Sequence, residues 1–156
     1  MLKSGPIIIV EDDWDDQQLL KESFDELRLP NLLRFFDTAF SAFDYLVTTK
    51  ERPFLIISDI NLPAMSGLEF LKKINDHPIL RSNCIPFIFF STASDPGMIK
   101  RAYQLSAQGY FVKPLTSLQL QETMATILSY WKLSSAPCIP DSVRWFHWPR
   151  PFRYNW

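Results

Sequence analysis

Five apolar runs of strand length recur along this chain, and longer amphipathic stretches separate them. The runs lie at residues 7–10, 32–36, 54–57, 85–90 and 110–112. They are almost continuously apolar, which is typical of parallel strands that are buried on both faces. Because parallel neighbours need a crossover connection, usually a helix, the pattern predicts strands and helices in alternation.

Apolar residues recur at helical spacing between the runs, and they predict five helices. The helices are expected to begin near residues 13–16, to lie around 41–47 and over 67–75, and to begin after residues 95 and 116. Asp95 is predicted to cap the fourth helix, because Pro96 follows it at the first helical position. Pro30 is expected to end the first helix. Thr116 is expected to cap the fifth helix and Leu118 to lie on its apolar face.

Five βα units joined by right-handed crossovers predict an α/β fold. The expected form is a doubly wound, flavodoxin-like (βα)5 three-layer sandwich with a parallel five-stranded sheet in the order 2-1-3-4-5. This order is the common choice for the architecture. It makes the first and third strands neighbours at the topological switch point, where ligands bind beyond the carboxyl ends of the strands. Glu11, Asp12 and Asp59 occupy those ends.

The chain has 156 residues, of which 47% are apolar, and this is enough for one domain with a substantial core. We expect this domain over residues 1–133. The formal net charge of -1 gives no reason to expect binding to nucleic acid or to an anionic membrane surface. No stretch has the length of a signal peptide or a membrane span. A cytoplasmic protein is expected, with Cys84 as a reduced, buried thiol beside an apolar run.

Residues 134–156 differ in composition and are expected to form a C-terminal extension rather than a second domain. The segment is rich in proline, large aromatic residues and arginine, including Pro137, Pro140, Trp145, Trp148, Trp156, Arg144, Arg150 and Arg153. Three interpretations are open: the extension covers an apolar patch of its own domain, joins two copies in a homodimer, or docks another protein. Aromatic residues and arginine are enriched in protein interfaces, which suits the last two.

Charged or hydroxyl side chains follow four of the predicted strands. Glu11 and Asp12 follow the first, Asp59 the third, Ser91 the fourth and Lys113 the fifth. Charges beside a buried strand are costly to remove from water unless they meet an opposite charge. Since the carboxyl ends of parallel strands share one edge of a sheet, the acids and the lysine are expected to converge in one site.

Clustered carboxylates without histidine or cysteine ligands suit Mg²⁺, which typically takes one or two carboxylates and completes its octahedron with water and phosphate oxygens. With their charge compensated, one carboxylate can attack a phosphoryl group as a nucleophile. Lys113 is placed to stabilise the charge on the phosphoryl oxygens, and Ser91 to donate a hydrogen bond to them. The predicted chemistry is phosphoryl transfer to an aspartate.

Four segments carry these residues: IIIVEDD at 7–13, LIISDINLPAMSG at 55–67, PFIFFSTAS at 86–94 and GYFVKPL at 109–115. Their order and spacing resemble the receiver domain of two-component response regulators, over residues 6 to about 132. The resemblance implies a single-domain response regulator in which Asp59 accepts a phosphoryl group from a sensor histidine kinase. It also implies that the receiver catalyses this transfer itself. The protein is then a signalling protein rather than an enzyme, and it binds a downstream protein partner when phosphorylated.

The resemblance also implies the roles of individual residues around the metal. Glu11, Asp12 and Asp59 are expected to bind Mg²⁺, together with the backbone carbonyl of Asn61. Asp13 is then expected to cap the first helix instead of binding the metal.

Three further residues match positions that respond to phosphorylation in this family. Ser91 corresponds to the switch hydroxyl, with Thr92 as its neighbour, and serine stands where threonine is commoner. Lys113 is the family's lysine, and the bond to Pro114 is expected to be cis, as it commonly is there. Tyr110 matches an aromatic residue whose rotamer accompanies activation. The extension from residue 134 lies outside the family pattern.

Two alternatives remain within this fold class. A degenerate receiver would serve as a phosphorylation-independent protein-binding scaffold, but the complete set of acids, hydroxyl and lysine argues against it. A phosphatase with an aspartate nucleophile usually carries a general acid two residues after it, where Asn61 stands. About 22 residues follow the fifth predicted helix, too few for a DNA-binding or catalytic effector domain, so the expected output is protein binding.

Overall fold

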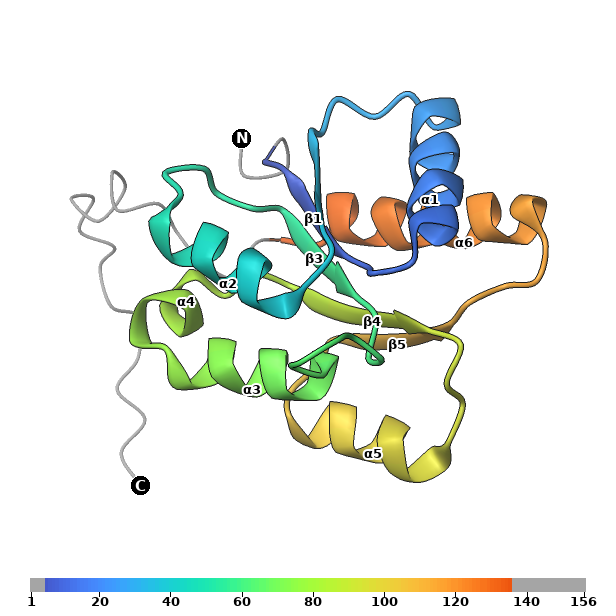
Figure 1. The fold of residues 1–156 in the computed structure, drawn as a ribbon. Coiled ribbons are helices and arrows are strands. Elements are labelled where there is room, and N and C mark those ends of the chain that lie inside the picture. The colour runs from blue at the N-terminus through green and yellow to red at the C-terminus, as the bar shows by residue number, and fades with distance from the viewer. Residues whose placement is uncertain (1–4, 136–156) are drawn as a thin grey trace, which may run out of the picture.

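The computed structural model describes residues 5–135 as five strands and six helices (Figure 1). The strands are β1 (Ile7–Val10), β2 (Leu33–Phe36), β3 (Leu55–Ser58), β4 (Phe87–Ser91) and β5 (Gly109–Val112). The helices are α1 (Trp14–Glu26), α2 (Ala39–Thr48), α3 (Gly67–Asp76), α4 (Pro78–Asn83), α5 (Pro96–Gln104) and α6 (Ser117–Leu133). The aromatic residues of the predicted extension lie outside the described residues, so the division of the chain after residue 133 stays a prediction.

The five strands form one parallel sheet in the order β2-β1-β3-β4-β5, which confirms the predicted doubly wound fold. Residues of β1 and β3 are buried along their whole length, as their continuous apolar sequence predicts. Val10 pairs with Phe36 on one side and with Ser58 on the other. The residues that follow Val10 and Ser58 therefore leave the sheet at the same edge.

Helices cover both faces of the sheet. In Figure 1, α1 and α6 lie on one face, and α2, α3, α4 and α5 lie on the other. Alternate residues of each strand enter the two layers: Ile7 and Ile9 pack with α1 and α6, whereas Ile8 and Val10 pack on the opposite side. Both faces are filled with apolar side chains, so the ends of the strands are where polar groups can gather.

The predicted helix starts are confirmed where a capping residue had been identified. The side chains of Asp13, Asp95 and Thr116 accept backbone hydrogen bonds at the starts of α1, α5 and α6. No helix in the described part of the chain is long and apolar enough to cross a membrane.

The helices differ from expectation in two places. Helix α4 was not predicted, because its six residues make fewer than two turns and cannot show a helical repeat. It begins with Pro78, and the side chain of His77 caps it. Pro30 does not end α1, which already stops at Glu26, and the chain turns at Arg28 with a φ of 48°.

Two burial expectations are wrong. Leu118 is 64% exposed, because it lies two residues before the buried Leu120, about 200° away around the helix. Cys84 is exposed and not buried. It forms the C-cap of α4 and precedes β4, so it lies outside the sheet that would have covered it.

Gly67 places the start of α3 against the segment that follows Asp59. Its N–H donates to the carbonyl oxygen of Ile60 at 2.8 Å, and an added Cβ would lie 2.2 Å from the carbonyl oxygen of Asp59. We therefore expect Gly67→Ala to lower the free energy of unfolding by about 1–3 kcal/mol, the usual cost of overpacking. Urea denaturation followed by circular dichroism measures this loss.

Gly97→Ala in α5 is the matched control. There the added Cβ would meet only the side chain of Asp95, at 3.1 Å, and alanine is the better helix former. Its unfolding free energy is expected to stay within about 0.5 kcal/mol of the parent value. Equal losses in the two variants would contradict the close approach at Gly67.

Candidate functional site

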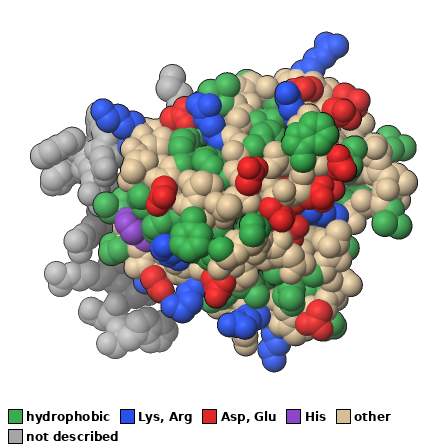
Figure 2. Space-filling model, in the orientation of Figure 1, with side chains coloured by type: hydrophobic (Ala, Val, Ile, Leu, Met, Phe, Trp, Pro, Cys, Tyr) green, Lys and Arg blue, Asp and Glu red, His purple; other side chains and the backbone are tan. Residues whose placement is uncertain are grey.

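The predicted site residues come together at the carboxyl edge of the sheet. Glu11, Asp59 and Lys113 each follow the last residue of a strand, and Ser91 is the last residue of β4. Backbone hydrogen bonds fix their spacing: the Asp59 N–H donates to the Val10 carbonyl, and the Lys113 N–H donates to the Ser91 carbonyl, both at 2.9 Å. Figure 2 shows acidic side chains gathered on this part of the surface.

The carboxylate of Asp59 is almost fully buried, and its two oxygens have different surroundings. Oδ1 accepts hydrogen bonds from the backbone N–H groups of Ile60 at 2.6 Å and Asn61 at 3.1 Å, and from the Ser91 hydroxyl at 2.7 Å. Oδ2 accepts a hydrogen bond from the Lys113 ammonium at 2.9 Å. Three donors thus hold Oδ1 in place and orient Oδ2 toward the lysine.

The Lys113 ammonium binds three carboxylates at once. Its Nζ lies 2.5 Å from Glu11 Oε2, 2.7 Å from Asp16 Oδ2 and 2.9 Å from Asp59 Oδ2. Burial disfavours the charged ammonium, but hydrogen bonds to Asp16, Glu11 and Asp59 outweigh this effect and hold the pKa of Lys113 above its ordinary value. The lysine therefore stays charged near neutral pH.

Glu11 is the most buried of the acids around Lys113. Burial raises its pKa, and the hydrogen bond and positive charge of Lys113 oppose this rise only in part. Its other oxygen accepts the Asp13 N–H at 3.0 Å, and Asp13 in turn accepts the Asp16 N–H at 3.0 Å as the cap of α1. The expectation that Asp13 caps the helix is thus confirmed.

Other predicted site residues lie around this centre. Asp12 and Asn61 are exposed beside it, and Asn61 contributes its N–H to Asp59. Ser91 is fully buried whereas Thr92 is exposed, so the hydroxyl that reaches Asp59 belongs to Ser91. Tyr110 is partly buried, and its hydroxyl donates to the Ala93 carbonyl at 2.7 Å.

The bond between Lys113 and Pro114 is trans, so the expected cis isomer is wrong for this structure. Trans is the ordinary isomer of a bond before proline, and the lysine ammonium contacts Glu11 and Asp59 with the bond in this form.

Sequence reasoning missed two residues of α1 that help to build the site. Asp16 lies in the stretch for which the sequence predicted only the start of a helix, but its carboxylate binds Lys113. The Gln17 amide donates to the Glu11 carbonyl at 2.6 Å and to Asp37 Oδ1 at 2.7 Å, which ties the ends of β1 and β2 together. Both residues lie near the start of a helix that directly follows β1, and this position could have indicated that they lie near the site.

The donor chemistry of the site fits a hard divalent cation. The described residues contain no group of three acids or histidines already spaced around a metal position. However, the carboxylates of Glu11 and Asp59 both contact the Lys113 ammonium, and Asp12 directly follows Glu11 in the chain. One or two such carboxylates suffice for Mg²⁺, which takes its remaining ligands from water and phosphate.

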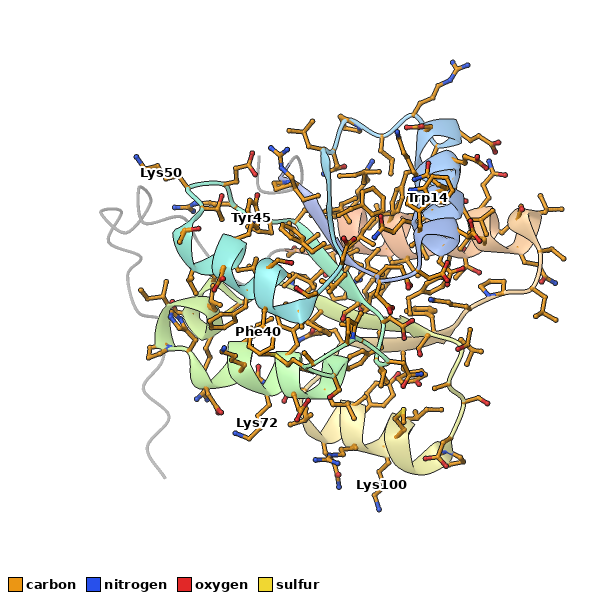
Figure 3. All side chains as sticks on the ribbon, viewed as in Figure 1. Trp14, Phe40, Tyr45, Lys50, Lys72 and Lys100 are labelled. Atoms are coloured by element: carbon orange, nitrogen blue, oxygen red, sulfur yellow. The ribbon has the colours of Figure 1, made fainter. Side chains whose placement is uncertain are left out.

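Trp14 is a large apolar side chain beside the acids. It is the first residue of α1, it is 68% exposed, and Figure 3 shows it on the outer side of that helix. Tryptophan is enriched in protein interfaces and among the residues that contribute most to binding.

Comparisons with known proteins agree with this geometry. The family model of the response regulator receiver domain matches residues 7–125. The probable methanogenesis regulatory protein FilR2 of Methanothrix harundinacea is 28% identical over 129 residues, which are 80% of this chain and 82% of that protein. The phosphorylated cyanobacterial phytochrome response regulator RcpA has a TM-score of 0.78 and 28% identity, covering 86% of this chain and 99% of that one.

A second solved structure is that of the Mn²⁺-bound response regulator Rcp1. It has a TM-score of 0.76 and 26% identity, and the match covers 86% of this chain and 99% of the Rcp1 chain.

The buried hydroxyl of Ser91 is expected to stabilise the fold through its bond to the Asp59 carboxylate. Ser91→Ala should lower the free energy of unfolding by about 1.5–3 kcal/mol, the range for a hydrogen bond to a charged group. Thr92→Ala is the control, because that side chain is exposed, and a change below about 0.5 kcal/mol is expected. Urea denaturation of both variants at neutral pH provides the measurement. A larger loss for Thr92→Ala than for Ser91→Ala would contradict the assignment.

Proposed function

Because the chain belongs to the response regulator receiver domain family, we propose that Asp59 accepts a phosphoryl group from the phosphohistidine of a sensor histidine kinase. The observation that carries the proposal is the environment of the Asp59 carboxylate. Its Oδ1 is held by three donors, and its Oδ2 faces a buried, charged lysine. A nucleophile held in this way has one oxygen available for attack, beside a positive charge that stabilises the product.

In the proposed transfer, Asp59 Oδ2 forms a bond to phosphorus while the bond between phosphorus and the histidine nitrogen breaks. The imidazole leaves with the electron pair of that bond. Lys113 remains charged and turns from Oδ2 to a phosphoryl oxygen. The Ser91 hydroxyl, now bonded to Oδ1 at 2.7 Å, is close enough to turn to another phosphoryl oxygen.

We propose Mg²⁺ as the cofactor, held by Glu11, Asp12 and Asp59 with the backbone carbonyl of Asn61. When bound, it would neutralise the repulsion between these carboxylates and the incoming phosphoryl oxygens. The Mn²⁺-bound form of Rcp1, a relative of similar fold, supports this assignment by analogy.

The proposed output is phosphorylation-dependent binding of a downstream protein. A path of hydrogen bonds leads outward from Asp59: the Ser91 hydroxyl also accepts the Ala93 N–H at 3.3 Å, and Tyr110 donates to the Ala93 carbonyl. If the Ser91 hydroxyl turned toward a phosphoryl group, the backbone at Ala93 would shift with it. This shift would change the hydrogen bond between Tyr110 and the Ala93 carbonyl. The path supports a switch role for Tyr110 at the surface of β5.

The exposed position of Trp14 indicates which surface the phosphoryl donor would cover. Any protein that brings a phosphohistidine to Asp59 must cover the edge of the sheet beside α1, and there the exposed Trp14 ring offers apolar area for contact. We propose that the kinase contacts this residue.

Incubation with acetyl phosphate and Mg²⁺, followed by intact-protein mass measurement, tests the proposed function. The chain is expected to gain one phosphoryl group as the bond between phosphorus and the acetyl oxygen breaks and acetate leaves. Asp59→Asn should gain none, because an amide is not a nucleophile at this position. Excess chelator should also prevent the gain.

Asp44→Asn is the matched control, since Asp44 is an exposed acid of α2 that takes no part in the hydrogen bonds and ion pairs of the site. This variant should be phosphorylated like the parent protein. A parent protein that stays unmodified under conditions that phosphorylate another receiver would contradict the proposal. It would favour the alternative of a phosphorylation-independent scaffold.

For the extension at residues 134–156 we propose a role in homodimer formation. Its aromatic residues and arginines have the composition of a protein interface, and aromatic burial supplies a large part of the free energy of such contacts. Removal of residues 135–156 is expected to halve the mass measured by light scattering at micromolar concentration. An unchanged mass, with and without phosphorylation, would contradict this role and leave packing within one chain or binding of another protein.

A further inference from the structure

Asp16 contributes a third carboxylate to the Lys113 ammonium, and the proposed phosphoryl transfer gives it no task. We propose that Asp16 is a positioning residue, which holds the Lys113 ammonium at the site while the bonds of that ammonium to Glu11 and Asp59 are exchanged. The inference rests on the proposed function of Asp59 and concerns how the same site keeps its lysine in place.

All the N–H donors of the Lys113 ammonium are already used in its three bonds. An ammonium has three N–H donors, and Lys113 directs one to each of Glu11, Asp16 and Asp59. A phosphoryl oxygen can receive one of these donors only if an existing bond is given up. Which of the three bonds is given up depends on what each carboxylate does in the proposed reaction.

Two of the three partners have other tasks during the proposed reaction. Asp59 Oδ2 is the atom that becomes bonded to phosphorus, and Glu11 is among the acids proposed to face the metal ion. Asp16 has no such second task, so its bond at 2.7 Å is the one that can persist through the transfer. A lysine side chain has several rotatable bonds, and fixing it in one conformation costs rotamer entropy. One persistent partner keeps the ammonium from leaving the site when its other bonds are broken.

The burial of the two side chains fits a tether. The side chain of Lys113 is 9% exposed and that of Asp16 is 36% exposed. Asp16 therefore stays partly hydrated, and keeping its negative charge costs less desolvation than for the buried Glu11. Because the ammonium end of the pair is buried, solvent screens the contact less than it screens a surface ion pair.

The position of Asp16 in α1 makes the tether a link between distant segments. Asp16 lies in the first turn of α1, and its N–H is held by the Asp13 cap at 3.0 Å. Lys113 follows β5, at the far side of β3 and β4 in the sheet. The bond therefore joins the start of α1 to the connection between β5 and α6, across the carboxyl edge of the sheet.

A simpler role for Asp16 is to stabilise α1 through the helix dipole. A substitution of Asp15 distinguishes this role from the proposed contact with Lys113. Both acids lie in the first turn of α1, but Asp15 is exposed and its charge meets the same helix terminus. Asp15→Asn removes the dipole contribution and leaves the contact with Lys113. Asp16→Asn removes both, and Asp16→Glu restores the charge on a longer side chain.

The experiment compares these three variants with the parent protein in phosphorylation by acetyl phosphate at saturating Mg²⁺. For Asp16→Asn we expect the maximal rate to fall about 3- to 10-fold, the size of effect that follows when a contact to a catalytic group is lost. The acetyl phosphate concentration at half-maximal rate should change by less than about twofold, because the contact acts on the transition state. Asp15→Asn should match the parent, and Asp16→Glu should recover most of the rate.

Two results would overturn the proposal: the rate of Asp16→Asn equals or exceeds that of the parent, or Asp15→Asn slows the reaction as much as Asp16→Asn does. A parent protein that gains no phosphoryl group is a different result, because it overturns the proposed function itself.

The tether has a second readout that needs no phosphorylation. The ¹⁵N-bound ammonium protons of a buried, hydrogen-bonded lysine exchange slowly enough for detection by NMR, whereas those of a loosened lysine exchange rapidly with water. The Lys113 signal is expected in the parent and in Asp15→Asn, and its loss or broadening is expected in Asp16→Asn. An unchanged Lys113 signal in Asp16→Asn would overturn the tether.

Discussion

The ion cluster of Lys113 is the interaction on which the edge of the sheet depends. Glu11 and Asp59 are almost fully buried, and without the ammonium their charges would repel each other in a poorly hydrated space. The lysine compensates them and also connects β1, β3 and β5, which are not consecutive in the chain. The same contacts thus serve the fold and place the groups proposed for phosphoryl transfer, which is common where charges are buried at a reactive site.

Much of the fold was predictable because it follows from patterns along the sequence. Runs such as residues 7–10 are short and apolar throughout, and a strand covered on both faces buries every residue of such a run. Leu118 and Cys84 were misjudged because burial depends on the direction of a side chain within its element, and a few residues of sequence leave that direction open. Helix α4 is shorter than the repeat that would reveal it.

The candidate site was predictable to the extent that its residues follow strands. Glu11, Asp59, Ser91 and Lys113 meet because parallel strands end at one edge. Asp16 was not recognised, because acids at a helix start have a sufficient local explanation in the helix dipole. Its contact with Lys113 joins residues 97 positions apart, and no short-range pattern carries that information.

The exposed position of Leu118 has a consequence for how such a protein can change over evolutionary time. Side chains such as Leu118, Tyr103 and Val112 lie on the outside of α6, α5 and β5 and contribute little to either core. The bonds of the ion cluster, by contrast, involve strand ends and the first turn of α1. Substitutions on the outer surface can therefore change a possible contact surface without altering the groups proposed for phosphoryl transfer at Asp59. Related chains can therefore differ in the proteins that this surface would bind while the ion cluster at the strand ends stays the same.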